Sequence, residues 1–373
     1  MPWSTTTVSE LRTAFAHAVR TAKRPVAQAA RDFGISRPTA YKWLARFDAQ
    51  QPLHDRSRRP LRSPARTPRE LEAAVLAVRD QFGWGPRKIA AYLRNSDQPT
   101  LPVRTAAAIL RRHGRITAPV APTGEADRRF ERSEPNQLWQ VDFKGFVEVA
   151  RQKVYPLSVL DDHSRFLLAL GCGTDVTMAR AWDVLWGVFG EYGLPQSVLC
   201  DNAFGSSGPG VSWFEARLMR LGIRAIHGRA YHPQTQGKVE RLHGTLEAEI
   251  LPRLPRDDIA RFEAGLDRWR REVYNLVRPH EALGDVAPVS RWRPSGRRRP
   301  AQLPPVEYPA GCILRKVSTV GDVRWRGAKI LAGGGLIGEH VRVEEVGGAV
   351  VLWYGPHQIR QIPLDQLHKP GLL

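Results

Sequence analysis

Three acidic residues in the middle of the chain have types and positions that could bind divalent metal ions. Asp142 lies in LWQVDFKGFVEV, a run rich in strand-forming residues, and Asp201 ends the short apolar strand in PQSVLCDN. Glu240 lies in YHPQTQGKVERLHGTLEAE, which begins as a loop and continues as a predicted helix. Hard divalent cations prefer oxygen ligands such as carboxylates. An aspartate alone often caps a turn or a helix, and a lone glutamate usually lies on a solvated helix face. The combination is more specific than any one of the three.

The predicted helix around Glu240 indicates how its carboxylate is presented. Apolar residues recur at three- and four-residue spacing and make one face: Val239, Leu242, Leu246 and Ile250. Glu240 lies beside that face, with Gly237 and Gly244 as its same-side neighbours. Glycine is a poorer helix former than alanine by about 1 kcal/mol, so two glycines here indicate that a large partner approaches the carboxylate. Lys238 and Arg241 add positive charge suited to a polyanion.

These stretches together resemble a known family, the DDE transposases of bacterial insertion sequences with a retroviral integrase-like catalytic core. The IS3 and IS481 groups are the most similar. The matching stretches occur in this order: WQVDF (139–143), LSVLDDHSRF (157–166), VLCDN (198–202), YHPQTQGKVERLHGTL (231–246) and YNLVRPHEAL (274–283). Their joint occurrence is far more specific than any one of them.

The resemblance implies that Asp142, Asp201 and Glu240 form the catalytic, metal-binding triad. Between the second and third members lie 38 residues, close to the usual spacing of the family. The resemblance further implies two Mg²⁺ (or Mn²⁺) ions per active site, with Asp142 bridging both. Two ions roughly 4 Å apart can activate the attacking oxygen of a phosphoryl transfer and stabilise the departing one. Glu247 stands where many relatives have Lys or Arg, so Lys238, Arg241 or His243 is expected to contact DNA instead.

Positive charge is concentrated near the N-terminus. The chain has 373 residues and a formal net charge of +19, and residues 1–130 hold 24 Lys/Arg against 10 Asp/Glu. This asymmetry predicts nucleic acid as a partner. No apolar run of about 18 residues or N-terminal signal segment is found, so we expect a soluble, cytoplasmic protein with no membrane partner. The 3 cysteines are scattered and predict neither disulfides nor a structural zinc site.

Residues 1–50 are predicted to form a first helix-turn-helix DNA-binding unit. In VAQAARDFGISRPTAYKWLARF (26–47), Ala27, Ala30 and Phe33 predict the inner face of one helix, Gly34 a turn, and Ser36 the cap of a second helix. Ala40, Trp43 and Leu44 of that second helix are predicted to face inward. The residues predicted to contact DNA from it are Arg37, Thr39 and Lys42. An ordinary helical hairpin with a basic surface is the alternative.

A basic linker, residues 51–68, separates this unit from a second helical unit, residues 69–115. The linker is rich in proline and arginine and is predicted to follow DNA in an extended form. Its predicted phosphate contacts are Arg58, Arg59 and Arg62. In the second unit GWGPRKIAAYL resembles the second helix-turn-helix of the same transposases. The residues there predicted to bind DNA are Arg87, Lys88 and Arg104.

A linker (116–135), an α/β catalytic core (136–292) and a second basic linker (293–304) are predicted to follow. The core pattern predicts three antiparallel strands and then alternating helices and strands, which by itself indicates only a mixed α/β class. The resemblance implies a ribonuclease H-like fold. Residues 305–373 contain short strand patterns joined by Gly-rich turns, and we predict a small β-barrel. The fold is therefore expected to be multidomain.

The resemblance implies a DNA transposase that binds the terminal inverted repeats of its element, cleaves the ends and joins the 3′-hydroxyl to target DNA. Because two ends must be joined, a homo-oligomer on DNA is expected. Two alternatives stay open. One is a non-catalytic DNA-binding regulator derived from a transposase, and the other is a metal-dependent nuclease that cuts without joining.

Overall fold

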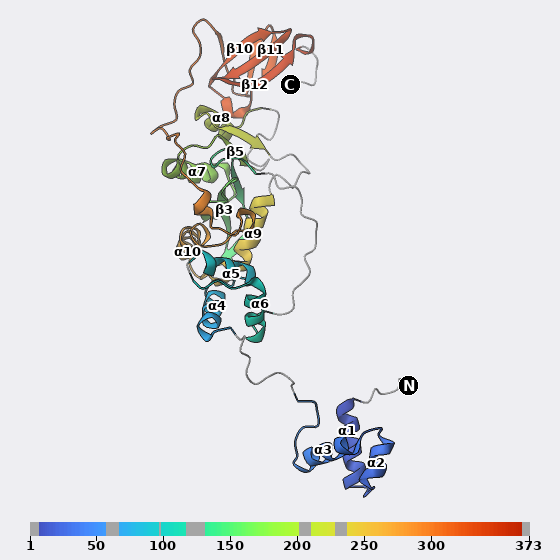
Figure 1. Ribbon diagram of the computed structural model, residues 1–373. Coiled ribbons are helices and arrows are strands. Elements are labelled where there is room, and N and C mark those ends of the chain that lie inside the picture. Colours follow the sequence, from blue (N-terminus) through green and yellow to red (C-terminus); the bar gives the residue numbers. More distant parts are fainter. Residues whose placement is uncertain are drawn as a thin grey trace. The chain divides into compact units, whose positions relative to one another are not determined.

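The computed structural model describes residues 7–56, 67–96, 98–116, 131–200, 210–227 and 237–367 (Figure 1). The chain divides into two compact units, Met1–Thr67 and Pro68–Leu373. Asp201 and the linker arginines Arg58, Arg59 and Arg62 lie outside the described residues. No helix of the described part is long and apolar enough to cross a membrane.

The first unit is a bundle of helices α1 (Val8–Arg20), α2 (Val26–Asp32) and α3 (Arg37–Asp48). Its core contains Phe15, Trp43 and Leu44, together with the buried Ala29, Ala30 and Ala40. Gly34 adopts a φ of +63° in the turn, and the Ser36 hydroxyl accepts a hydrogen bond from the Thr39 amide, as predicted. One detail is wrong, because Ala29 is buried where Ala27 was predicted. Helix α1 was not predicted, although Phe15 and Val19 show helical spacing.

The second unit begins with helices α4 (Arg69–Phe82), α5 (Pro86–Asn95) and α6 (Val103–Arg112). Its apolar residues keep helical spacing and form its core, in which Leu71 is half-buried and the following are buried: Val75, Val78, Ile89, Ala90, Leu93, Ala106, Ile109 and Leu110. Gly83 ends α4 in the left-handed conformation, with a φ of +75°. The sequence pattern alone therefore located this helical unit, because its apolar residues keep helical spacing throughout.

A six-stranded sheet follows, in the order β2–β3–β1–β5–β6, with β4 paired to β3. Strands β1, β3 and β4 are antiparallel, whereas β1, β5 and β6 are parallel. The bounds are β1 Trp139–Phe143, β2 Val147–Val149, β3 Gln152–Asp161, β4 Leu167–Gly173, β5 Ser197–Cys200 and β6 Arg224–His227. This arrangement confirms the predicted antiparallel start and the later alternation of strands and helices.

Helices cover both faces of the sheet (Figure 1). One face packs on α7 (Met178–Tyr192) and α8 (Trp213–Arg220), around Trp139 and Phe189. The other packs on α9 (Gly237–Glu249) and α10 (Ile259–Arg268). Short helical segments complete the chain: Leu251–Arg253, Trp269–Tyr274, Glu281–Leu283, Pro288–Arg291, Gly334–Leu336 and Leu364–Gln366.

The C-terminal region has the predicted strands but not a closed barrel. A four-stranded sheet runs in the order β12–β11–β10–β7, and β8 and β9 form a separate hairpin. The bounds are β7 Ile313–Lys316, β8 Asp322–Trp325, β9 Ala328–Leu331, β10 His340–Val346, β11 Ala349–Tyr354 and β12 His357–Pro363. No ladder joins the two sheets within the described residues, so the predicted small β-barrel is not confirmed.

This region packs on the core through main-chain contacts. The Val211 amide donates to the Ala332 carbonyl at 3.0 Å, and the Gly335 amide donates to the Val211 carbonyl at 2.9 Å. A Cβ at Gly335 would collide with the backbone of Ser212 and Trp213, so only glycine permits this approach.

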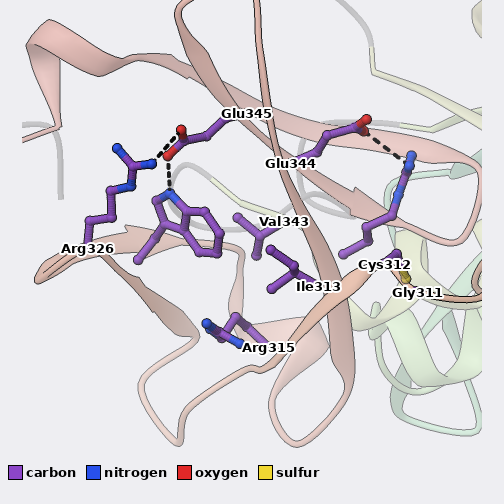
Figure 2. A pocket seen from close by; sticks show the side chains of 10 residues that line it. Gly311, Cys312, Ile313, Arg315, Arg326, Val343, Glu344 and Glu345 are labelled. Atoms are coloured by element: carbon purple, nitrogen blue, oxygen red, sulfur yellow. Dashed lines mark hydrogen bonds and ion pairs between the residues drawn. The ribbon is translucent and has the colours of Figure 1, made fainter.

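Beside the β8–β9 hairpin lies a concave pocket of about 540 Å³ lined by Arg315, Arg326 and Glu345, among others (Figure 2).

Candidate active site

Asp142 lies on β1 in the middle of the sheet. It pairs with Ser158 of β3, and the preceding Val141 pairs with Cys200, the last residue of β5. Its carboxylate is about one-quarter exposed, with a side-chain exposure of 23%. A strand at the centre of a sheet is held on both sides by main-chain hydrogen bonds. Asp142 therefore presents an accessible carboxylate on a rigid support.

Glu240 lies in the first turn of α9 and is exposed. The predicted apolar face of this helix is confirmed, since Val239, Leu242 and Leu246 are buried against β3 and β4. That burial fixes the rotation of the helix about its axis. The Glu240 carboxylate consequently faces away from the core.

His243 connects the two carboxylate positions. Its Nδ1 atom lies 3.9 Å from Asp142 Oδ2, and its Nε2 atom lies 3.5 Å from the Ser158 hydroxyl. The Ser158 hydroxyl in turn donates to the Asp142 carbonyl at 3.3 Å. Residues three apart lie on the same side of a helix, so Glu240 is one turn away from the residue that contacts Asp142. The structure therefore brings Asp142 and Glu240 into one region, although they are far apart in the sequence.

The imidazole of His243 is neutral at neutral pH. Burial, together with the smaller effect of the positive charge of Lys144, lowers the pKa of His243 to about 4. Lys144 Nζ lies 2.8 Å from Glu247 Oε1, and this hydrogen bond lowers the pKa of Glu247. Lys144 was not among the residues predicted from the sequence. The available signal was its position two residues after Asp142, because side chains two apart in an extended segment point to the same side.

Lys238 is turned toward the protein rather than toward solvent. Its ammonium donates to the Asp162 carboxylate and, at 3.3 Å, to the Asp162 carbonyl. Asp162 is only 4% exposed and also accepts from the Arg132 amide and the Gln140 side chain, both at 2.8 Å. The neighbouring Asp161 accepts from the amides of Asn136 and Ser164. Both aspartates therefore order the turn after β3, and Lys238 anchors the start of α9 to it.

The other residues predicted to bind DNA fall into three groups. Arg37, Lys42, Arg104 and Arg241 are exposed, and Thr39 is half-buried beside Ser36. Arg87 and Lys88 instead make ion pairs within the protein, Arg87 with Glu281 and Asp285, and Lys88 with Glu249. Arg58, Arg59 and Arg62 lie outside the described residues.

The carboxylates are suitable ligands for a hard divalent cation, because their donors are all oxygens. Within the described residues no group of three His, Cys, Asp or Glu side chains is placed to hold a metal ion. Asp201, which directly follows Cys200 of β5, is outside that part of the chain. The membership of Asp201 in the site therefore stays a prediction.

Comparison with known proteins places this site within a recognised domain. Two family profiles, each described as "Integrase core domain", match residues 132–233 and 221–288. Profiles described as "Homeodomain-like domain" and "Helix-turn-helix domain" match residues 39–110 and 17–60. The predicted helix-turn-helix units and ribonuclease H-like integrase core are therefore supported.

Individual relatives match the same central part. The Gag-Pro-Pol polyprotein of Mason-Pfizer monkey virus is 36% identical over 118 residues, which cover 31% of this chain and 6% of the polyprotein. The "Insertion element IS476 uncharacterized 39.2 kDa protein" of Xanthomonas euvesicatoria is 26% identical over 170 residues, covering 45% of this chain and 47% of that protein. The chain thus spans about half or less of these relatives. A chain of the solved complex between the simian T-cell lymphotropic virus intasome and PP2A regulatory subunit B56 gamma aligns with a TM-score of 0.38. That alignment has 16% identity and covers 78% of this chain and 96% of that chain.

Proposed function

Because this chain is a transposase/integrase-like protein with an integrase core domain and helix-turn-helix domains, we propose that it is a DNA transposase. It binds the terminal inverted repeats of an insertion sequence through its helix-turn-helix units. It cleaves the ends of the element and joins the 3′-hydroxyl to target DNA by two-metal phosphoryl transfer.

One observation carries this proposal: α9 packs on the sheet so that His243 Nδ1 lies 3.9 Å from Asp142 Oδ2, one turn from Glu240. Charge repulsion between clustered carboxylates is destabilising, and a polyvalent cation would offset that repulsion. Val141 is in register with Cys200, so the chain leaves β5 beside the strand that carries Asp142. This register supports Asp201 as the third member of the site.

Two bound Mg²⁺ or Mn²⁺ ions would activate the attacking oxygen and stabilise the departing one. Asp142, Asp201 and Glu240 would hold these ions. Ser158 and the neutral His243 would keep the Asp142 strand and α9 in fixed relation, since one hydroxyl contacts both. The exposed Arg241 lies beside Glu240 and would contact the phosphate backbone of the bound DNA.

DNA recognition is assigned to the helical units. Arg37 and Lys42 are exposed on α3, and Arg104 is exposed near the start of α6. Helices that begin with exposed cations can enter the major groove and contact base edges and phosphates. Since two element ends must be joined to one target, we propose a homo-oligomer assembled on DNA.

The test is Glu240→Gln, which keeps the shape of the side chain and removes its charge. We expect cleavage and strand transfer to be lost by at least 100-fold while binding of a labelled end oligonucleotide is retained. Glu148→Gln is the matched control, because Glu148 is an exposed glutamate on β2 in the same core. Strand-transfer products are measured by gel electrophoresis with Mg²⁺ and with Mn²⁺.

The outcomes separate the alternatives. Normal strand transfer by Glu240→Gln would remove Glu240 from the mechanism. A wild-type protein that binds the ends but cuts nothing with either ion is a regulator derived from a transposase. One that cuts and never joins is a metal-dependent nuclease.

A further inference from the structure

The C-terminal end of α9 carries a buried carboxylate that receives hydrogen bonds from three residues in two separate segments. Glu249 accepts from Trp84 Nε1 at 3.0 Å and from Lys88 Nζ at 2.7 Å. It also accepts a bidentate pair from Arg278, at 2.9 Å from Nε and 2.8 Å from Nη2. Both carboxylate oxygens are thereby shared between the second helical unit and the core.

The centre of this cluster is almost completely removed from solvent, and only Lys88 of the three donor residues is partly exposed, at 33% of its side chain. Trp84 is 1% exposed, Arg278 is 5% exposed and Glu249 is 8% exposed. Burying a charge is unfavourable unless it is paired and hydrogen-bonded. Four donor atoms therefore hold this carboxylate in place, because moving the charged donors of Lys88 and Arg278 away would leave a buried charge without its partners.

Two sequence motifs meet at this carboxylate. Trp84 and Lys88 belong to GWGPRK in the second helical unit, and Arg278 belongs to the RPH stretch of the core. Neither motif is used by the proposed chemistry. Both motifs therefore take part in one contact between the second helical unit and the core.

Further contacts surround this centre. Val273 and Val277 of the core pack against the apolar core of the second helical unit. At the rim, Arg87 pairs with Glu281 at 2.8 Å. The side-chain amide of Asn95 donates to the Asp285 main-chain carbonyl, also at 2.8 Å. The helical unit is therefore joined to the core by an apolar patch, a buried charge cluster and a polar rim.

Helix α9 links this contact to the candidate active site. Glu240 and Glu249 are nine residues apart on the same helix, which corresponds to roughly 13–14 Å along its axis at 1.5 Å per residue. One end of the helix carries the proposed metal ligand, and the other end holds the helical unit whose α6 is proposed to contact DNA.

We propose that Glu249 is a positioning residue that fixes the distance between DNA recognition by α6 and cleavage at Glu240. The docked helical unit selects which phosphodiester of the element end reaches the active site. This inference rests on the proposed function, because it concerns where that reaction occurs.

The test uses the full chain with Glu249→Gln, which preserves shape and removes the charge. Trp84→Phe is a second variant, which removes the indole donor and keeps an aromatic ring at this position. For both we expect end binding within about 3-fold of the wild type, whereas cleavage spreads from one phosphodiester to several neighbours. The cut position is mapped at nucleotide resolution on a labelled end. Glu148→Gln is the matched control and should cut at the single wild-type position.

A second measurement does not depend on activity. Spin labels are attached to cysteines introduced at the exposed Arg111 on α6 and Arg268 on α10, with Cys312 replaced by serine. Pulsed electron spin resonance should give a narrow distance distribution for the wild type and a broad one for Glu249→Gln and Trp84→Phe. An unchanged distribution in both variants would show that Glu249 does not fix the docked unit, and would overturn the proposal.

The two measurements also separate this inference from the proposed function. Broadened distances with an unchanged single cut position would overturn the positioning role and leave the transposase assignment intact. If the wild type does not cut DNA, the proposed function fails and with it the role in choosing the cut site. The docking of the helical unit through Glu249 is then decided by the distances alone.

Discussion

Replacing Lys238 with methionine separates a structural role from a role in binding DNA. Positive charge and a position beside Glu240 predict a DNA contact, whereas the structure directs the Lys238 ammonium to Asp162. Methionine keeps much of the aliphatic side chain and removes the charge. Lys238→Met should therefore destabilise the protein and displace the first turn of α9, which carries Glu240.

The magnitude follows from the surroundings of Asp162. Removing one partner of a buried ion pair costs about 3–5 kcal/mol. Asp162 keeps two other donors, the Arg132 amide and the Gln140 side chain, and Lys238 itself is 18% exposed at its side chain. Both features reduce the cost, so we expect a loss of about 2–3 kcal/mol in the free energy of unfolding.

Urea unfolding at equilibrium measures this value, and Asp162→Asn with the double variant completes a mutant cycle. A coupling energy above about 1 kcal/mol is expected for groups in direct contact. Arg241→Met is the matched control, since Arg241 is an exposed cation on the same helix and should affect DNA binding alone. If Lys238→Met keeps wild-type stability but binds DNA more weakly with a flatter salt dependence, Lys238 contacts DNA and this reasoning is wrong.

Three further predictions concern pH, metal and salt. Burial alone would raise the pKa of Glu249, but the hydrogen bonds and charges of Arg278 and Lys88 hold this pKa below its ordinary value of 4.5. The stabilising contribution of the ionised Glu249 should be complete above about pH 4.5 and be lost as the pH falls through the lower folded-state pKa. Urea unfolding should therefore show a stability difference between wild type and Glu249→Gln that shrinks as the pH falls below about 4.5. Strand transfer should require Mg²⁺ or Mn²⁺, while Ca²⁺ supports only binding; activity that survives EDTA would refute the two-metal proposal. Neutralising the linker arginines should weaken binding to specific and scrambled ends alike and flatten the log–log salt dependence by about 0.9 per lost phosphate contact, as fluorescence anisotropy would show. A loss confined to the specific end would contradict that role for Arg58, Arg59 and Arg62.

Local sequence patterns were sufficient for most helices and strands. The spacing of Ile89 and Leu93, or of Val239, Leu242 and Leu246, predicts which side of a helix is buried, and the structure confirms it. The turn at Gly34 and the cap at Ser36 are equally local, because they depend on the conformations and hydrogen bonds of a few adjacent residues. The pairing of Asp142 with Glu240 came instead from the family resemblance, since no local pattern joins residues so far apart.

What the tertiary structure decided is which charged groups meet. Lys88 and Lys238 carry the same charge as Arg37 and Lys42, and sequence composition gives no reason to separate them. Only the folded chain shows that Lys88 lies against Glu249 and Lys238 against Asp162. The free energy of a charge depends on its burial and on its partner, and both are set by segments distant in sequence. The presence of short strands after residue 305 was likewise predictable from local patterns, whereas their arrangement as an open sheet and a hairpin depends on pairing between distant segments.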